Sequence, residues 1–329
     1  MKILVTGGAG YIGSVVAQEL LHNGHSVLVY DDLSHGHRCA VPAGAEFVRG
    51  DIADRETLDA ILAASSFDAV MHFAGLIEAG ESMKEPEKYF RVNSGHTLLL
   101  LERILARGIR RFVFSSTAAL YGNPQRIPIC EDDPLQPTNV YGESKLLVEQ
   151  MLAWFNRIHG LRYASLRYFN AAGATEEQGE AHHPESHLIP LVLEVAIGKR
   201  EAVSIFGTDY PTPDGSCIRD YIHVSDLAAA HLMALNAMET RDRLIYNLGS
   251  GKGFSVREVI EVARRVTGHP IPARETPRRP GDPAVLVASS EKIGKELGWR
   301  PKFPALDEIV RSAWRWMQMH PDGPGDGAC

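Results

Sequence analysis

The sequence has few cysteines and no long apolar run. Its four cysteines, Cys39, Cys130, Cys217 and Cys329, are far apart and form no CxxC pair. This spacing predicts neither a zinc site nor a disulfide framework, and reduced thiols in the cytoplasm fit it best. No apolar stretch approaches the roughly 18 residues that span a bilayer, and a strand pattern begins at the first residues. We therefore expect no signal peptide, no membrane segment and a cytoplasmic location.

The chain also lacks an excess of positive charge. Its formal net charge is -7 at pH 7, with 34 Lys and Arg against 41 Asp and Glu. Binding to a phosphate backbone needs clustered basic residues, so nucleic acid is disfavoured as a partner. Hydrophobic residues make up 44% of the 329 residues and charged residues 23%, which is ordinary for a globular enzyme.

Short apolar runs alternate with helical patterns through the first half of the chain. This alternation predicts βαβ units and a parallel sheet, and near-continuous apolar strands predict helices on both of its faces. The fold class is therefore α/β, a doubly wound parallel sheet of the Rossmann type. Strands are predicted at 3–5, 27–30, 47–50, 69–75 and 111–116, and helices at 13–23, 57–64 and 87–107.

Beyond residue 170 the sequence becomes richer in polar turns. Residues 174–186 and 207–216 form polar segments of a length that is usually functional in a compact domain. A further helix is predicted over 218–238, followed by a strand over 244–251. We expect an NAD-binding Rossmann domain over 1–170, to which the chain returns around 219–249. The rest, 171–329, is expected to form a smaller α/β substrate-binding lobe interlaced with the first.

The glycine-rich stretch TGGAGYIG lies directly between the first predicted strand and helix. Gly7, Gly10 and Gly13 allow a tight turn, close approach of backbone N–H groups to a pyrophosphate, and close packing of helix on strand. The helix N-terminus adds a partial positive charge that faces this anion. Asp31 and Asp32 follow the second strand, near the offset at which an acid binds a ribose diol. Because a carboxylate there repels a 2′-phosphate, NAD is favoured over NADP.

Tyr141 and Lys145 lie four residues apart in a helix predicted after Pro137, so they share one helix face. A phenol with an ordinary pKa of about 10 is a weak base, but a lysine and the positive nicotinamide ring of NAD would lower that pKa. The phenolate could take a proton from a substrate hydroxyl while the hydride on the same carbon goes to NAD. A hydroxyl of FSSTAALYG, residues 114–122, would hold the substrate oxygen. By itself, YxxxK is also compatible with a partly exposed helix face.

Together these motifs resemble the extended short-chain dehydrogenase/reductase family over essentially the whole chain. The segments MHFAGLIEAGES, LRYFNAAGA, FGTDYPTPDG, IRDYIHV and RRPGD are similar to its UDP-glucose 4-epimerase branch. The resemblance implies an isomerase of galactose metabolism that epimerises a UDP-hexose reversibly at C4, through a 4-keto intermediate. It also implies tightly bound NAD that is regenerated in each turnover, and a homodimer joined through helices near 88–107 and 141–158.

The resemblance also assigns roles position by position. Tyr141 matches the base, Lys145 its helper, and Thr117 the hydroxyl that bonds to the sugar oxygen. Two positions depart from the pattern: Ile77 replaces a lysine found beside NAD in some members, and Leu286 has an intermediate size where the family gates the sugar. The positions matched to NAD are Gly7, Gly10, Tyr11, Ile12, Gly13, Asp31, Asp32, Leu33, Asp51, Ile52, Phe73, Ala74, Gly75, Asn93, Ser115, Tyr141, Lys145 and Tyr168. The positions matched to the nucleotide sugar are Thr117, Asn170, His187, Leu188, Ser204, Phe206, Arg219, Tyr221, Arg279, Asp282 and Leu286.

Other enzymes and one non-enzyme remain alternatives. Dehydratase relatives carry Asp-Glu after the Ser/Thr, whereas this chain has Ala118 and Ala119, so the acid that dehydration needs is missing. A 4-epimerase for UDP-N-acetylglucosamine, UDP-xylose or UDP-glucuronate stays open. A catalytically silent NAD-binding regulatory protein is disfavoured by the intact catalytic set.

A metal hydrolase built from His182, His183 and His187 is the weakest alternative. The segment AHHPESH has no helical HxxxH spacing and has the composition of a loop. We therefore expect no metal, and place His187 near the uracil.

Overall fold

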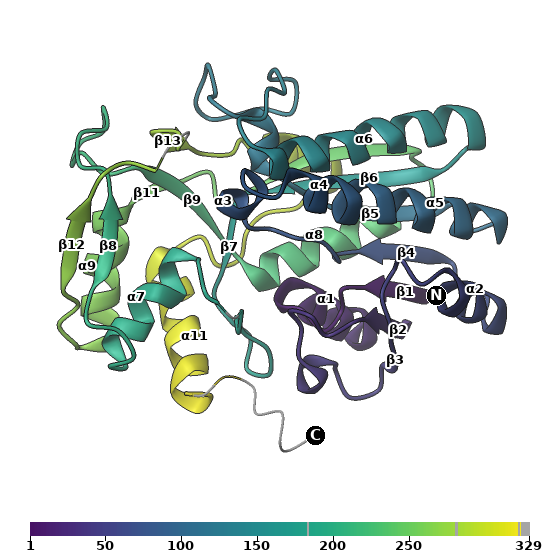
Figure 1. Cartoon of the computed structure of the whole chain (residues 1–329), viewed down its shortest axis with the longest axis horizontal. Helices are drawn as coiled ribbons and strands as arrows, with labels where there is room; N and C mark the ends of the chain where they lie inside the picture. The colour runs from purple at the N-terminus through teal and green to yellow at the C-terminus, as the bar shows by residue number, and fades with distance from the viewer. Residues whose placement is uncertain (183, 280–281, 322, 324–329) are drawn as a thin grey trace.

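Seven parallel strands form the centre of the larger part of the molecule (Figure 1). The computed structural model describes residues 1–182, 184–279, 282–321 and 323. The strand order is β10-β6-β5-β4-β1-β2-β3, so the winding direction reverses between β1 and β4 and leaves a ligand crevice at their carboxyl ends. The strands are β1 (Lys2–Thr6), β2 (Ser26–Asp31), β3 (Glu46–Arg49), β4 (Ala69–His72), β5 (Arg111–Thr117), β6 (Arg162–Tyr168) and β10 (Arg243–Leu248).

Helices cover both faces of this sheet, as its apolar strands require. All four residues of β4 are buried, and such strands need packing partners on each side. One face carries α1 (Tyr11–His22), α8 (Val224–Ala237) and α10 (Glu291–Leu297), and the other carries α2 (Arg55–Ala64), α5 (Thr97–Ala106) and α6 (Val140–His159). The predicted doubly wound α/β fold is confirmed.

The helix predicted over 87–107 contains a π-helical segment. The chain forms two short helices, α3 (Ala79–Ser82) and α4 (Pro86–Tyr89), then a π-helical segment, Phe90–His96, and then α5. A π-helical turn has wider spacing than an α-helix, and such turns are frequent at functional sites. Here the segment contains Asn93, whose side chain bonds to Leu76 and Ser144. The predicted helix over 87–107 is confirmed, and its π-helical segment is the part that the sequence did not predict.

The smaller part has its own sheets and its own core, seen at the left of Figure 1. Residues 218–238, predicted as one helix, divide into a strand and α8. The helix begins only after His223, whose Nδ1 accepts a hydrogen bond from the Ser225 amide and so caps α8. The strands are β7 (Asn170–Ala172), β8 (Val203–Phe206), β9 (Ile218–His223), β11 (Gly253–Ser255), β12 (Ala273–Thr276) and β13 (Val285–Leu286). The helices are α7 (Leu188–Ala196), α9 (Val256–Thr267) and α11 (Leu306–Met319).

The two parts are interlaced along the chain. After β9, α8 packs beside α1 and β10 pairs with β6, so this stretch belongs to the larger part. Trp299, which follows α10, is buried in the same core as α1 and α8. We propose that the two parts are the cofactor domain and the substrate lobe.

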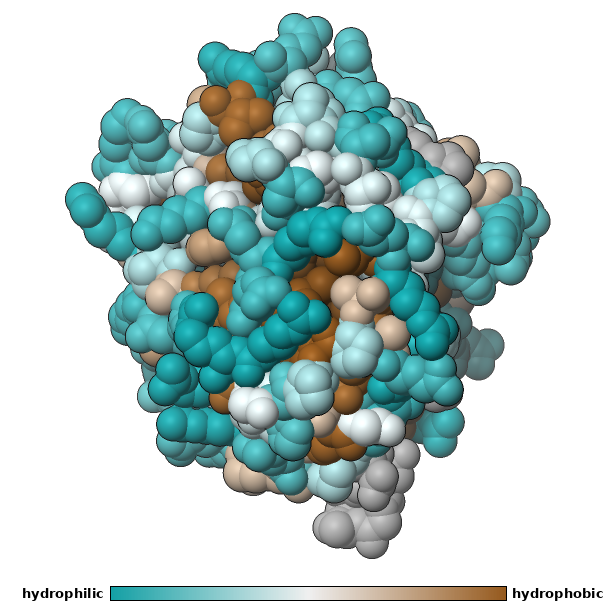
Figure 2. Space-filling model, turned by 90° about the vertical axis from the view of Figure 1, so that its left-hand side faces the viewer, coloured by the Kyte–Doolittle hydropathy of each residue, from teal (hydrophilic) through white to brown (hydrophobic). Residues whose placement is uncertain are grey.

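The outer side of the smaller part is shown in Figure 2. That face is mostly hydrophilic, and hydrophobic residues show chiefly in its hollowed centre. Within the described residues, no helix is long and apolar enough to cross a membrane.

Candidate active site

The turn between β1 and α1 is closed by glycines that the surrounding backbone requires. Gly7 has a φ of 75°, and a Cβ there would lie 2.4 Å from the Ala74 nitrogen. A Cβ on Gly13 would lie 2.1 Å from the Gly7 carbonyl oxygen. Neither distance is possible for real atoms, so these two glycines allow β1, β4 and α1 to meet.

Gly10 differs, because nothing in the protein fills the space beside it. Its Cβ would meet no atom closer than 3.4 Å, and Gly10 precedes α1 without any side-chain cap. The first amides of α1, on Tyr11 and Ile12, therefore begin a helix whose positive end faces open space. This is the cradle that a pyrophosphate needs, so the residues present fit a dinucleotide.

Acidic residues follow the next two strands, as predicted. Asp31 is buried at the end of β2, and its carboxylate accepts hydrogen bonds from the amides of Ala9 and Leu33, both at 2.9 Å. Burial raises the pKa of Asp31, and these two bonds oppose the rise. Asp31 thus joins β2 to the glycine turn, while Asp32 is exposed beside it.

Leu33 and the residues after β3 complete this side of the site. Leu33 has a φ of 64°, a left-handed conformation that is uncommon for a leucine. After β3, Asp51 is exposed and Ile52 is buried. Asp51 is joined to the sheet by the Tyr30 hydroxyl, which donates to its backbone carbonyl at 2.6 Å.

The loop after β4 is fixed to α6 through Asn93. The amide of Asn93 donates to the Leu76 carbonyl and to the Ser144 hydroxyl, both at 3.0 Å, and its oxygen accepts from the Leu76 amide. A Cβ on Gly75 would lie 2.9 Å from that oxygen, and Gly75 has a φ of 155°. Phe73 packs against His231 with ring centroids 5.0 Å apart. Phe73, Ala74, Gly75 and Asn93 therefore form one connected wall.

Tyr141 and Lys145 lie on α6, whose first turn is capped by the Asn139 side chain. The end of β5 packs against α6, which places the Thr117 hydroxyl beside the Tyr141 phenol. The buried Lys145 amine donates to the Ser115 carbonyl at 3.1 Å. Tyr168 pairs with Thr117 in the sheet and shares a hydrogen bond with Ser115. The predicted catalytic residues are thus brought together at the carboxyl edge of the sheet.

The protein alone does not lower the pKa of Tyr141. Burial raises that pKa, the hydrogen bond with Thr117 opposes the rise, and the negative charge of Glu78 adds to it. Burial also lowers the pKa of Lys145 to about 8. A phenolate here therefore needs a further positive charge, which the nicotinamide ring of bound NAD would supply.

Other hydroxyls of FSSTAALYG are engaged elsewhere. Ser116 donates to Glu149 at 2.6 Å, and the Tyr121 hydroxyl donates to Asn247 at 2.7 Å and accepts from Arg167 at 2.8 Å. Arg167 and Glu149 form a buried ion pair within this network. Thr117 is therefore the hydroxyl of this stretch that faces Tyr141.

Strand pairing in the smaller part brings several residues predicted to bind the nucleotide sugar to one place. Asn170 in β7 is the register partner of Tyr221 in β9, and Arg219 in β9 is the partner of Leu286 in β13. Arg219 also forms an ion pair with Asp282 at 2.5 Å. Residues from three distant segments are thus brought together around β9.

The remaining predicted sugar positions lie around β8 and α7. The Arg279 guanidinium is 4.0 Å from the centroid of the Phe206 ring. Ser204 precedes Phe206 by two residues in β8 and so points to the same side. His187 and Leu188 begin α7.

The sequence interpretation weighed His182 and His187 as metal ligands and set them aside, and it did not include Glu180. Glu180, His182 and His187 place one potential ligand atom each within 4.8 Å of one another. The pattern E-x-H-x-x-E-x-H over 180–187 would have been the signal, because it spaces four such groups closely along an irregular segment. His183 lies outside the described residues.

Comparison with known proteins shows which family the chain belongs to. Residues 3–249 match the NAD-dependent epimerase/dehydratase family. The chain belongs to this family. The UDP-glucose 4-epimerase of Streptomyces lividans is 55% identical to this chain over 326 residues. The match covers 99% of this chain and 98% of that relative.

Solved structures of UDP-glucose 4-epimerases have the same fold as this chain. The UDP-glucose 4-epimerase of Brucella ovis, in complex with NAD, has a TM-score of 0.93 and 44% identity, and 96% of this chain and 98% of that chain are covered. The UDP-glucose 4-epimerase of Bifidobacterium longum, in complex with NAD+ and UDP, has a TM-score of 0.94 and 37% identity. The match covers 98% of this chain and 100% of that chain.

Proposed function

We propose that the protein is an NAD-dependent isomerase that interconverts UDP-galactose and UDP-glucose at C4. The observation that carries this proposal is the meeting of Thr117, Tyr141 and Lys145 beside an open glycine cradle. Relatives similar over nearly the whole chain are UDP-glucose 4-epimerases, which supports the same reaction. NAD is the cofactor of this family.

The proposed residue roles follow from the contacts. Thr117 holds the sugar C4 oxygen in line with Tyr141, because its hydroxyl lies beside the phenol. Tyr141 takes the proton from that oxygen and later returns it. Lys145, which is buried and anchored to the Ser115 carbonyl, keeps the phenol in position and stabilises its ionised form. NAD, held at the glycine turn between β1 and α1, would supply the hydride acceptor for C4 when bound.

Epimerisation also requires the 4-keto sugar to present both faces to the same site. Arg219 and Arg279 are proposed to hold the diphosphate, because guanidinium donors match phosphate oxygens. Asn170, Tyr221 and Phe206 would bind the sugar and the uridine. The keto sugar can then swing about a fixed diphosphate while Thr117 and Tyr141 meet either face.

Leu286 bears on which UDP-sugars are accepted. It is partly buried against a small cluster that includes Tyr121 and Phe169, so its side chain forms part of a wall. Its intermediate size keeps epimerisation of UDP-N-acetylglucosamine, UDP-xylose or UDP-glucuronate as the second candidate function.

We further propose that the protein is a cytoplasmic homodimer. The exposed hydrophobic residues Leu98, Trp154 and Ile158 lie on α5 and α6, which pack side by side at one edge of the molecule (Figure 1). Such a surface is typical of a subunit interface. The scattered cysteines favour a reducing compartment.

The proposed function is tested by incubating the purified protein, with no added NAD, with UDP-galactose and with the other three sugars. We expect UDP-glucose to form, and nucleotide-sugar chromatography measures it. No turnover of any sugar, even with NAD supplied, would rule the proposal out. Preference for another sugar would replace UDP-galactose as the substrate.

A further inference from the structure

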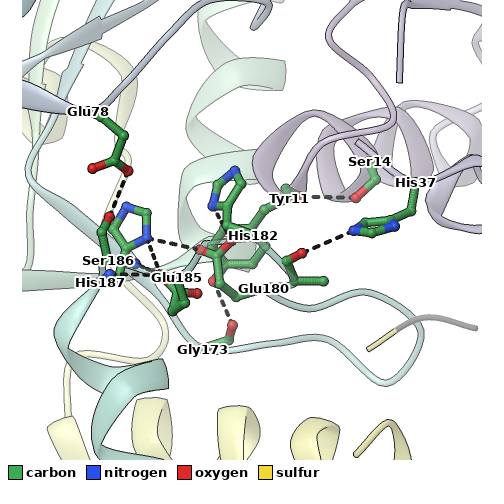
Figure 3. Close-up of polar contacts among 11 residues, drawn as sticks. Tyr11, Ser14, His37, Glu78, Gly173, Glu180, His182, Glu185, Ser186 and His187 are labelled. Atoms are coloured by element: carbon green, nitrogen blue, oxygen red, sulfur yellow. Dashed lines mark hydrogen bonds and ion pairs between the residues drawn. The ribbon is translucent and has the colours of Figure 1, made fainter. Parts of the chain in front are cut away.

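The segment between β7 and α7 gathers four ionisable side chains that the proposed reaction does not use as a group. Glu180, His182, Glu185 and His187 converge from this one segment, as Figure 3 shows. One potential ligand atom each from Glu180, His182 and His187 lies within 4.8 Å of the others.

Two of these atoms form a buried ion pair that lacks hydrogen-bond geometry. Oε1 of Glu180 and Nδ1 of His182 are 2.6 Å apart, yet neither has a hydrogen bond of ordinary geometry within the described residues. The Glu180 side chain is only 10% exposed. Buried polar atoms are normally satisfied, so this pair points to a ligand that the protein is shaped to hold.

The charge of the cluster suits a cation. Glu180, Glu185 and Glu78 supply three carboxylates, and the Ser186 hydroxyl donates to Glu78 at 2.7 Å. Glu185 accepts from Nδ1 of His187 at 2.9 Å, and metal-binding histidines commonly have such a carboxylate partner. A pocket of about 250 Å³ is lined by Glu180 and His182 on one side and, on the other, by Gly10 and Tyr11 of the glycine turn assigned to NAD.

We propose that Glu180, His182 and His187 form a binding site for a divalent transition-metal cation of the zinc class. Two imidazoles and one carboxylate are a ligand set that zinc favours, and it leaves a fourth position for water. Ligand atoms bound to zinc at about 2.0 Å lie roughly 3.3 Å apart in tetrahedral geometry. To close around the ion, the Glu180–His182 pair at 2.6 Å therefore has to separate slightly, and His187, whose Nδ1 is 3.9 Å from Glu180, has to move closer.

A cation bound at this site would also affect the proposed reaction, and this consequence rests on the proposed function. His187 is one of the residues predicted to contact the nucleotide sugar, so a bound cation withdraws it from that contact. We expect zinc to weaken UDP binding. The metal affinity itself is measured without any nucleotide sugar, so the two proposals fail separately.

The test uses tag-free, NAD-containing protein freed of metal by a chelator and titrated with Zn²⁺ against a zinc indicator. We expect one equivalent to bind, and Glu180→Gln and His182→Ala to weaken binding by about tenfold or more each. His159→Ala is the matched control, because this exposed histidine lies on α6 and outside the cluster. The zinc affinity of this variant should equal that of the wild type.

Two further measurements keep the proposal falsifiable. X-ray absorption of the zinc-loaded wild type should show imidazole ligands with oxygen, and sulfur ligands would overturn the proposal. Thermal unfolding and NAD content show that the variants fold. Absence of stoichiometric binding, or unchanged affinity in both folded cluster variants, would equally overturn it.

Discussion

At the scale of the residue, hydrogen-bond partners distinguish side chains of the same type. Tyr121 and Tyr141 are both phenols near the end of β5. Tyr121 is enclosed by Asn247 and Arg167, and burial raises its pKa to about 12. Tyr141 instead lies beside the Thr117 hydroxyl, in the first turn of α6.

Replacing each phenol should therefore have opposite effects. Tyr141→Phe should lower turnover by about 100-fold or more, because a general base is lost, while bound NAD stays. Tyr121→Phe should keep near-normal turnover but lower the free energy of unfolding by about 1–3 kcal/mol, because Asn247 and Arg167 lose a buried partner. Steady-state kinetics and urea unfolding measure both. Near-normal turnover in Tyr141→Phe would remove it as the base.

His72 makes stability depend on pH. It is buried at the end of β4, with Nδ1 at 2.7 Å from the Thr6 hydroxyl and Nε2 at 2.8 Å from the Thr97 hydroxyl. Because Thr97 donates its proton to the Asn93 carbonyl, Nε2 of His72 must donate to Thr97. Burial, aided by the charge of Lys145, lowers the pKa of this neutral His72 to about 3.

The unfolded chain binds a proton at this histidine below its ordinary pKa of about 6.5, whereas the folded chain does not. Stability from His72 is therefore complete above pH 6.5 and falls as the pH drops toward 3. We expect wild type to lose about 2 kcal/mol more of its free energy of unfolding between pH 7 and pH 5 than His72→Gln loses. Urea unfolding at both values measures it. The buried His223 and His231 also lower stability at acidic pH, equally in wild type and variant. If the free energy of unfolding had the same pH dependence in both proteins, His72 would not be the source of the difference.

At the scale of the element, the glycine turn separates folding from cofactor binding. Gly13 is needed for α1 to approach the Gly7 carbonyl, whereas Gly10 faces space that the protein leaves open. One turn therefore contains a glycine for packing and a glycine for the ligand.

This contrast predicts two different phenotypes. Gly10→Ala should change the free energy of unfolding of the NAD-free protein by less than about 0.5 kcal/mol but reduce retained NAD sharply, because the methyl group fills the pyrophosphate cradle. Gly13→Ala should destabilise the protein by about 2 kcal/mol or more, because its Cβ overlaps the Gly7 oxygen. NAD content after gel filtration and urea unfolding measure both. Full NAD retention in Gly10→Ala would show that the cradle is misplaced.

At the scale of the whole molecule, the two parts share one ligand edge while a separate side carries exposed hydrophobic residues. Trp154 is 59% exposed and Ile158 is 65% exposed on α6. These side chains are four residues apart and so lie on one face of the helix. Association of two chains would cover them.

The protein should therefore sediment as a dimer, and Trp154→Glu with Ile158→Glu should produce a monomer, because charges cannot be buried there without partners. Met319→Glu serves as the control, since Met319 is 58% exposed on α11, away from α5 and α6. Sedimentation velocity gives the masses. A monomeric wild type would contradict the homodimer.

The sequence by itself predicted the order of strands and helices, the glycine turn and the catalytic pattern, because periodicity and short spacings are local properties. Its failures are equally physical. The π-helical spacing inside the helix over 87–107 was not predicted, and β9 was hidden because Arg219 and Asp220 make a strand look polar. Asp220 is in fact fully buried and accepts bonds from the Ser250 and Gly251 amides.

The tertiary structure decided which side chains meet. It joins Thr117 to Tyr141 and diverts Tyr121 to Arg167. It also gathers Glu180, His182 and His187 from a segment without helical spacing. Such contacts depend on strand register and on loop paths that bring distant residues within about 3 Å, and no local pattern encodes those distances. The family and its chemistry could therefore be predicted from sequence, whereas the partners of each functional group required the fold.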